Sequence, residues 1–291
     1  MLQFIDFHTH SLEYGINSNS NLPLSSILNS PAISESDAPS YSRNLLEPTI
    51  LAIPSLDYSE YLGLTKISSY CAVGLHPWFL GQNININSRL SNSRLEAPHN
   101  YDFRHNLDEI MHQLWLIAQN SAVIAIGECG LDRYHANSVN HLYPSIDLES
   151  QIMAFAAQIE LSESLEKPLI IHCVKAFNEL ISLKQKHRPR MPWLVHGFDR
   201  KDDLRRSLAK HHINVSFGAS ILNPKSHSAL AMAAATEEQL FFETDAQSKF
   251  TIMDIYHQAA LIRRISLEKL QEQLRRNLCY LFNINFLNLK S

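Results

Sequence analysis

The sequence predicts a single (β/α)8 barrel of the TIM type, an α/β fold, on three observations. The chain has 291 residues, a length common for one such barrel, and 45% of them are hydrophobic, enough for one large core. Eight short apolar segments recur along it, as expected of parallel strands buried on both faces. Amphipathic segments separate the later ones, so strands and helices alternate. We therefore expect one domain over residues 1–291.

The predicted strands begin close to the N-terminus and continue to residue 246. They are LQFIDFH (2–8), PTILAIPS (48–55), YCAVGLHP (70–77), AVIAIGECG (122–130), PLIIHCV (168–174), PWLVHGF (192–198), INVSFGAS (213–220) and LFFETDA (240–246). The predicted helices are Asp147–Glu166, Lys175–His187, Arg200–His212, Lys225–Thr236 and, with leucines at helical spacing, Ser266–Phe282. A doubly wound open sheet is the alternative fold, but HTHSLEYG, after the first strand, lacks the glycine-rich turn typical of it.

Two segments, 12–44 and 81–106, interrupt the alternation of strands and helices. Both are rich in Ser, Asn and Pro, so we predict long loop insertions after the first and third strands. In a barrel, loops at these positions lie at the C-terminal face, over the active site. These loops either form a lid over a substrate or are poorly ordered segments with no role at the site.

The composition limits the classes of function. A net charge of −4 argues against strong sequence-independent binding of nucleic acid, although a local phosphate site remains compatible with it. The four cysteines form no CxxC pair, so we expect reduced thiols and a cytoplasmic protein. We find no signal-peptide pattern and no membrane-spanning apolar run, and we expect neither a membrane contact nor an obligate protein partner.

Side chains able to bind a metal lie at the ends of six predicted strands. His8 and His10, in FIDFHTH, are two apart and therefore share one face of the first strand. The other strands end in His76, Glu128, His172, His196 and Asp245. Strand ends converge on one mouth of a barrel, where this fold places its sites. Any one of these residues could be a hydrogen-bonded core residue, but their joint position predicts a metal site.

Four imidazoles together with the carboxylates of Glu128 and Asp245 would supply more ligands than the four that one tetrahedral ion takes. They therefore predict two divalent metal ions, with Glu128 central enough to bridge them. Imidazole-rich ligation favours zinc, manganese, iron or nickel over magnesium, and we take Zn, Mn and Mg as the candidates, with the identity open. Such ions generate hydroxide for hydrolysis, so Asp245, as proton acceptor, and Glu128 are the predicted catalytic residues. Asp6 shares the face of His8 deeper in the barrel, where we expect it to orient a histidine.

Several motifs resemble those of a known family. FIDFHTH, GLHPWF, IGECGLDR, PLIIHCVKA, HGF and ETDA occur in the order and spacing of the TatD-related metal-dependent hydrolases, and QIMAFAAQIELSESLEKP and RRNLCYLF resemble two further family segments. The resemblance implies a barrel of the amidohydrolase-like superfamily with the deoxyribonuclease activity of several members. It also implies a set of six metal ligands, which are His8, His10, Glu128, His172, His196 and Asp245.

The same resemblance implies that His76, Asp132 and Arg133 contact the substrate. A turn residue is the alternative for His76, and a surface salt bridge is the alternative for Arg133. HGFDR departs from the family pattern, because Asp199 and Arg200 stand where a small residue and glycine are usual. An acidic residue at a phosphate-facing turn would repel a nucleic-acid backbone. The metal site therefore matches the family pattern and the substrate pocket differs.

The leading functional hypothesis is a two-metal phosphodiesterase or deoxyribonuclease, acting on DNA or a small phosphodiester or ester. The alternative is an amidohydrolase or lactonase acting on a small cyclic amide or ester with the same metals. Such enzymes commonly bridge their ions through a modified lysine, and Glu128 in that role favours the first hypothesis. A non-catalytic binding protein with a relic site is a third possibility, and retention of all six ligands argues against it.

Overall fold

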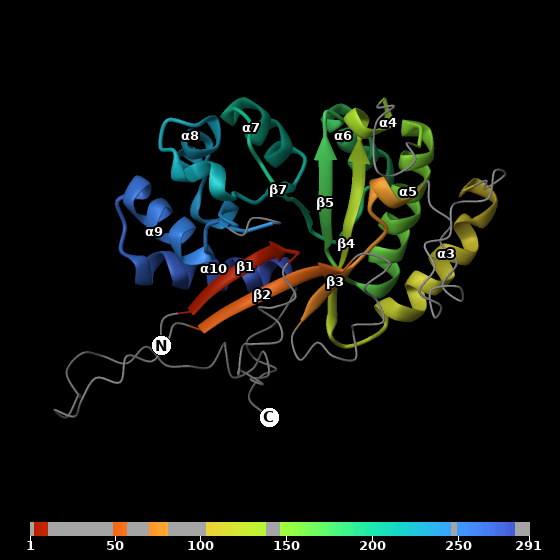
Figure 1. The fold of residues 1–291 in the computed structure, drawn as a ribbon, viewed down its shortest axis with the longest axis horizontal. Helices are drawn as coiled ribbons and strands as arrows, with labels where there is room; N and C mark the ends of the chain where they lie inside the picture. The colour runs from red at the N-terminus through yellow and green to blue at the C-terminus, as the bar shows by residue number, and fades with distance from the viewer. Residues whose placement is uncertain are drawn as a thin grey trace.

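The computed structural model describes residues 3–10, 49–56, 70–80, 103–137, 146–245 and 249–282. Within these residues, seven parallel strands form one sheet in chain order (Figure 1). The strands are β1 (Gln3–Thr9), β2 (Thr49–Leu56), β3 (Cys71–Val73), β4 (Val123–Asp132), β5 (Leu169–Val174), β6 (Trp193–Val195) and β7 (Ile213–Val215). All seven lie where apolar segments predicted strands.

The segment 240–245 joins β7 to β1 and closes the sheet. Phe217 pairs with Phe242 and Thr9 pairs with Asp245, both in parallel. The amide of Phe7 donates to the Phe242 carbonyl at 2.9 Å, and the amide of Asp245 donates to the His8 carbonyl at 3.1 Å. The (β/α)8 barrel is therefore confirmed. The eighth strand is shorter than predicted, because the segment makes isolated bridges and its backbone turns left-handed at Asp245, with φ 52°.

Helices surround the sheet. They are α3 (Phe103–Ala118), α4 (Arg133–Ala136), α5 (Leu148–Leu165), α6 (Phe177–His187), α7 (Asp202–Lys210), α8 (His227–Ala234), α9 (Ile252–Arg263) and α10 (Leu267–Leu281), with short 3-10 turns η3 (Pro77–Phe79), η5 (Ala219–Leu222) and η6 (Glu237–Gln239). The five predicted helices are confirmed to within two residues at each end. Capping explains the accuracy at two N-termini, since Asp147 accepts from the Ser150 amide and Ser266 from the Lys269 amide.

The two predicted loops have different outcomes. Residues 12–44 lie outside the described residues, as do residues 81–102. The predicted boundary at 106 is wrong, because α3 begins at Phe103. Two further helices, α3 and α9, were not among the helices predicted from the sequence. Among the described helices, none is long and apolar enough to cross a bilayer.

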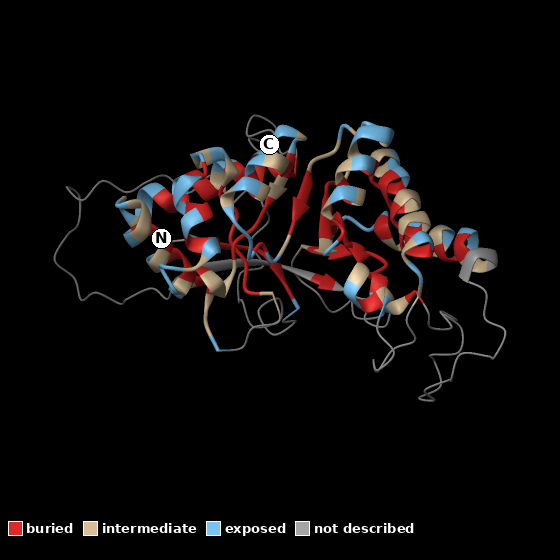
Figure 2. Ribbon diagram, turned by 90° about the horizontal axis from the view of Figure 1, so that it is seen from above, coloured by how far each residue is buried: buried red, intermediate tan, exposed pale blue. Residues whose placement is uncertain are grey.

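The core fills the interior of the barrel and the space between strands and helices. Figure 2 shows buried residues along the strands and exposed residues on the outer faces of the helices. Phe7 meets Phe241 edge-to-face across the closing seam, with ring centroids 5.0 Å apart. Tyr256 of α9 packs edge-to-face on Phe4 at 5.2 Å. Its hydroxyl accepts from the Ile5 amide at 3.0 Å and donates to the Ile5 carbonyl at 3.1 Å, so α9 is fastened to β1.

Tyr256→Phe should lower the free energy of unfolding by about 1–3 kcal/mol, because it leaves the buried amide and carbonyl of Ile5 without this partner. Urea denaturation followed by circular dichroism measures the change. The matched control is Tyr280→Phe, since Tyr280 is 62% exposed and should shift stability by less than about 0.5 kcal/mol. Equal stability of the two variants would contradict the proposed role of the Tyr256 hydroxyl.

Candidate metal centre

Glu128, near the C-terminal end of β4, occupies the middle of a cluster of histidines and is 5% exposed. Its Oε1 lies 2.6 Å from His196 Nε2, 2.8 Å from His172 Nδ1 and 3.0 Å from His76 Nε2. These three histidines come from the ends of β6, β5 and β3. One carboxylate oxygen therefore contacts imidazoles from three different strands.

The other oxygen, Oε2, faces the histidines of β1. It lies 3.0 Å from His10 Nε2 and 3.6 Å from His8 Nε2. Asp245 approaches the same two rings from the closing segment, with Oδ1 at 3.5 Å from His10 Nε2 and 3.7 Å from His8 Nε2. Ser55 of β2 is hydrogen-bonded to His8 Nδ1 at 2.9 Å, so the Nε2 edge of that ring points at the two carboxylates. The two oxygens of Glu128 thus face two separate groups of side chains.

These residues fit a divalent cation. The sets His8–His10–Asp245, His8–Glu128–His196 and His76–Glu128–His172 each bring their ligand atoms within 4.8 Å of one another. Atoms that bind one zinc-type ion at about 2.0–2.2 Å lie roughly 3–4 Å apart. The buried His8 Nε2 has no hydrogen-bond partner within the described residues, and its distances to the two carboxylates are too long for such bonds but suit shared coordination.

The carboxylates of the cluster are ionised at neutral pH. Burial by itself raises the pKa of Glu128, but the surrounding histidines, His196 and His76 foremost, hold it well below its usual value. Burial also raises the pKa of Asp245, whereas the nearby imidazoles of His8 and His196 lower it to about 2. Two negative charges thus face the imidazoles, as expected of a site that attracts cations.

The histidines differ in protonation. Burial lowers the pKa of His8 and of His76 to about 4, so both imidazoles are neutral near pH 7. His172 differs, because its contacts with Asp132 and Glu128 outweigh burial and raise its pKa to about 9. Burial lowers the pKa of His196 as well, but the charge of Glu128 raises it overall. The negative charge of Glu128 thus favours the protonated forms of His172 and His196.

Asp132, at the end of β4, is 2% exposed and lies behind His172. It accepts from Trp78 Nε1 at 2.8 Å, interacts with His172 Nε2 at 3.1 Å and caps α4 through the His135 amide at 2.8 Å. Burial raises its pKa, but the hydrogen bonds from His172, the His135 amide and Trp78 lower it to about 2. This geometry favours orientation of His172 over the substrate contact that the resemblance implies.

Arg133 points away from the cluster. Its guanidinium pairs with Glu179 of α6, and its Nε donates to the Lys175 carbonyl at 3.1 Å. The side chain is 41% exposed. The structure therefore favours the surface salt bridge over a phosphate contact for this residue. His76, in contrast, lies inside the cluster, where its Nδ1 accepts from the Trp78 amide at 3.1 Å.

Asp6 joins β1 to the closing segment. Its carboxylate accepts from the Thr244 hydroxyl at 2.6 Å, from the Thr244 amide at 3.1 Å and from the His8 amide at 3.4 Å. Burial raises its pKa to about 7. Its contact with His8 is through the backbone amide, and its predicted role in orienting a histidine stays a prediction.

Sequence reasoning missed several supporting residues. Gln151 and Gln158 of α5 are seven apart and hold the ends of β4 and β3, because each amide group bonds both the N–H and the carbonyl of one residue, Asp132 or Leu75. Glu243 is buried and accepts from the Gly197 amide at 2.5 Å and from the Ser216 hydroxyl. Burial raises its pKa to about 7. The sequence could have indicated Glu243, because it lies two residues before Asp245 and strand alternation puts both side chains on one face.

The comparisons with known proteins give the family. A family model described as TatD related DNase matches residues 5–283. This chain belongs to the TatD-related DNase family. Its solved structural neighbours include YJJV, a TatD homologue from Escherichia coli, with a TM-score of 0.65 at 18% identity over 97% of this chain and 98% of that one. A TatD family hydrolase from Entamoeba histolytica follows with a TM-score of 0.59 at 18% identity over 96% and 98%. These likenesses support the barrel fold of this TatD-related chain.

Curated relatives match shorter stretches of this TatD-related chain. A 3′-5′ ssDNA/RNA exonuclease TatD from Erwinia billingiae is 34% identical over 95 residues, 32% of this chain and 33% of the relative. The Pantoea ananatis protein of that name is 26% identical over 141 residues, 47% and 51% of the two chains. The deoxyribonuclease Tat-D of Schizosaccharomyces pombe is 29% identical over 128 residues, 43% and 38%. The chain thus spans about a third to a half of the length of these relatives.

Metal binding to this centre should strengthen as the pH rises toward about 9, because His172 is protonated below that pH and must lose its proton before Nδ1 can bind a cation. Titration calorimetry in buffers of different ionisation enthalpy counts the released protons. In Asp132→Asn the metal affinity should stop rising at a lower pH than in wild type, because the substitution removes the contact that most raises the pKa of His172. Equal affinities for wild type at pH 6 and pH 9 would contradict this assignment.

Proposed function

We propose that this chain is a metal-dependent phosphodiesterase that shortens single-stranded nucleic acid from its 3′ end. The observation that carries the proposal is the buried Glu128 carboxylate, whose two oxygens face two separate imidazole groups at the mouth of a TatD-related barrel. Such an arrangement suits two cations with one bridging carboxylate. Relatives of this chain are a 3′-5′ ssDNA/RNA exonuclease and a deoxyribonuclease, which supports the choice of substrate.

We assign the ligands by the oxygen that they face. His8, His10 and Asp245 with Oε2 of Glu128 would hold one ion, and His172 and His196 with Oε1 would hold the other. Zn, Mn and Mg are the candidate metals, with the imidazoles favouring Zn or Mn. Divalent ions bound here would supply Lewis acidity for a phosphoryl oxygen and lower the pKa of a water molecule toward neutrality.

Asp245 is the residue best placed to accept the proton of the attacking water. Its side chain is 38% exposed, whereas Glu128 is 5% exposed. Its pKa of about 2 keeps it ionised at neutral pH. It lies at the left-handed turn that ends the closing segment, at the mouth of the barrel. An ionised, accessible carboxylate beside the site of attack suits a general base.

Trp78 offers a surface for a nucleobase. It is 39% exposed, and its indole is fixed by the hydrogen bond to Asp132 and by a ring contact with His76 at 5.1 Å. A rigid aromatic face next to a cation site suits single-stranded nucleic acid, because every base can stack on it. His76, beside it, remains our candidate for a substrate contact.

Glu128→Gln should abolish cleavage, by at least about 10³-fold, and lower the metal content, because the amide removes the charge that both imidazole groups face. A 5′-labelled single-stranded oligonucleotide with Mn²⁺, Mg²⁺ or Zn²⁺ measures cleavage, and elemental analysis measures the metal. Glu160→Gln, on the exposed face of α5, is the matched control. Full activity of Glu128→Gln would refute the site.

Asp245→Asn should reduce kcat by about 10²–10⁴-fold while the fold is kept, because the amide cannot accept a proton. Single-turnover cleavage of the same oligonucleotide at saturating metal measures the rate. Asp203→Asn, whose side chain is 83% exposed on α7, controls for loss of a carboxylate. An unchanged rate in Asp245→Asn would assign the proton to another group.

The choice of substrate distinguishes the nuclease activity from the alternative amidohydrolase or lactonase activity. Turnover of a lactone or a cyclic amide by the metal-loaded protein, with no cleavage of DNA or RNA, would overturn the nuclease proposal in favour of an amidohydrolase or lactonase. Stepwise shortening of the oligonucleotide supports it.

A further inference from the structure

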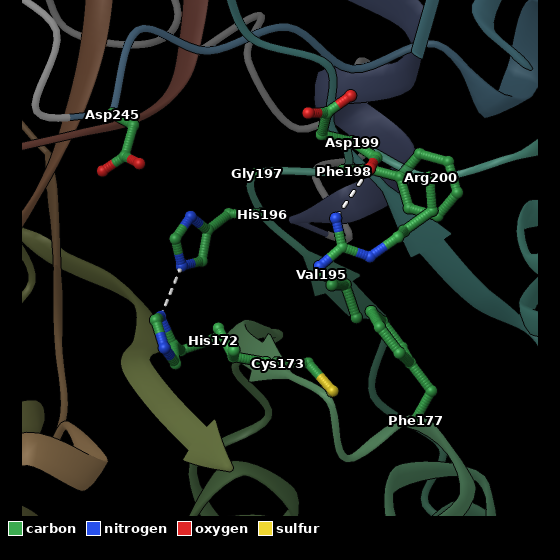
Figure 3. A pocket seen from close by; sticks show the side chains of 11 residues that line it. His172, Cys173, Phe177, Val195, His196, Gly197, Phe198, Asp199, Arg200 and Asp245 are labelled. Atoms are coloured by element: carbon green, nitrogen blue, oxygen red, sulfur yellow. Dashed lines mark hydrogen bonds between the residues drawn. The ribbon is translucent and has the colours of Figure 1, made fainter. Parts of the chain in front are cut away.

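A cavity of about 190 Å³ adjoins the candidate metal centre, beyond the ends of β5 and β6 (Figure 3). Its wall on the metal side is formed by His172, His196 and Asp245. Phe177, Val195 and Phe198 supply apolar lining. The volume is below the roughly 300–1,000 Å³ of sites for drug-sized ligands, so the cavity suits one unit of a polymer and not several.

Arg200 supplies the positive charge of this cavity. Figure 3 shows its guanidinium directed toward the side where His196 lies. Within the described residues, its one hydrogen bond goes from Nη1 to the Asp199 carbonyl at 2.8 Å. The remaining N–H groups of the fork are therefore available for a phosphate. Arg133, the arginine implied by the family resemblance, is instead engaged by Glu179 and the Lys175 carbonyl.

Asp199 adds a negative charge on the same lining. Its side chain is exposed, and its carboxylate has no hydrogen bond or ion pair among the described residues. A carboxylate accepts hydrogen bonds from hydroxyl groups and repels phosphate. An arginine and an aspartate side by side therefore suit a ligand with one phosphate and a neighbouring hydroxyl.

We propose that this cavity binds the 3′-terminal nucleotide of a strand, with Arg200 donating to its phosphodiester and Asp199 accepting from its terminal sugar hydroxyl. The apolar side chains pack against the sugar and base. The inference rests on the proposed nuclease function, and it explains why one end of the strand is selected: a terminal hydroxyl satisfies Asp199, whereas a terminal phosphate is repelled. Asp199 and Arg200 are thus specificity-determining residues.

The test uses equilibrium binding, which does not depend on cleavage. Two 5′-fluorescein-labelled single-stranded oligonucleotides, identical except for a 3′-hydroxyl or a 3′-phosphate, are titrated with full-length protein in chelator and followed by anisotropy. Wild type should prefer the 3′-hydroxyl. Arg200→Ala should weaken binding of both about tenfold, the loss expected for a charge-assisted contact, and reduce the salt slope by about 0.7. Asp199→Asn should remove most of the preference.

Two arginine variants are the controls. Arg190→Ala removes the same charge before β6, at the opposite end of the barrel, where Arg190 pairs with Glu163 and is 71% exposed. Its binding should match wild type, and Arg133→Ala should have a smaller effect than Arg200→Ala. Equal binding by the Arg200 and Arg190 variants, or no end preference in wild type, would overturn the inference. Binding of this pattern without metal-dependent cleavage would instead overturn the proposed function alone.

Discussion

The site depends on one interaction, the contact between the buried carboxylate of Glu128 and the imidazoles around it. A buried charge is costly unless it is paired, and here its partners come from the ends of β1, β3, β5 and β6. The strands β3, β4, β5 and β6 are neighbours in the sheet, and the segment 240–245 bridges to β1 at Thr9, which brings Asp245 to the histidines of β1.

A second layer of polar groups keeps the cluster in place. Ser55 and Asp132 bond the far nitrogens of His8 and His172, which fixes the rings with their remaining nitrogen toward the carboxylates. Gln151 and Gln158 satisfy the backbone where β4 and β3 leave the sheet. Each of these four side chains bonds a residue outside its own element, so the two glutamines of α5 also connect that helix to the strands.

Arg133 and Arg200 illustrate how the position of a side chain after a strand depends on its neighbours in the fold. Arg133 directly follows β4, but Glu179 of α6 lies close enough to pair with it. Arg200 follows the sixth strand and reaches a cavity beside the cluster.

Local patterns in the sequence predict the barrel, most of its elements and the set of residues that meet at its mouth. Apolar segments and capping residues are local signals, and strand ends such as Glu128 and His196 converge because parallel strands share a direction. Three features follow from contacts in the folded chain: Arg133 is paired, Asp6 accepts from the His8 amide, and the closing segment makes isolated bridges. Glu179 and Thr244 are far along the chain from their partners, and no local pattern encodes such distant contacts.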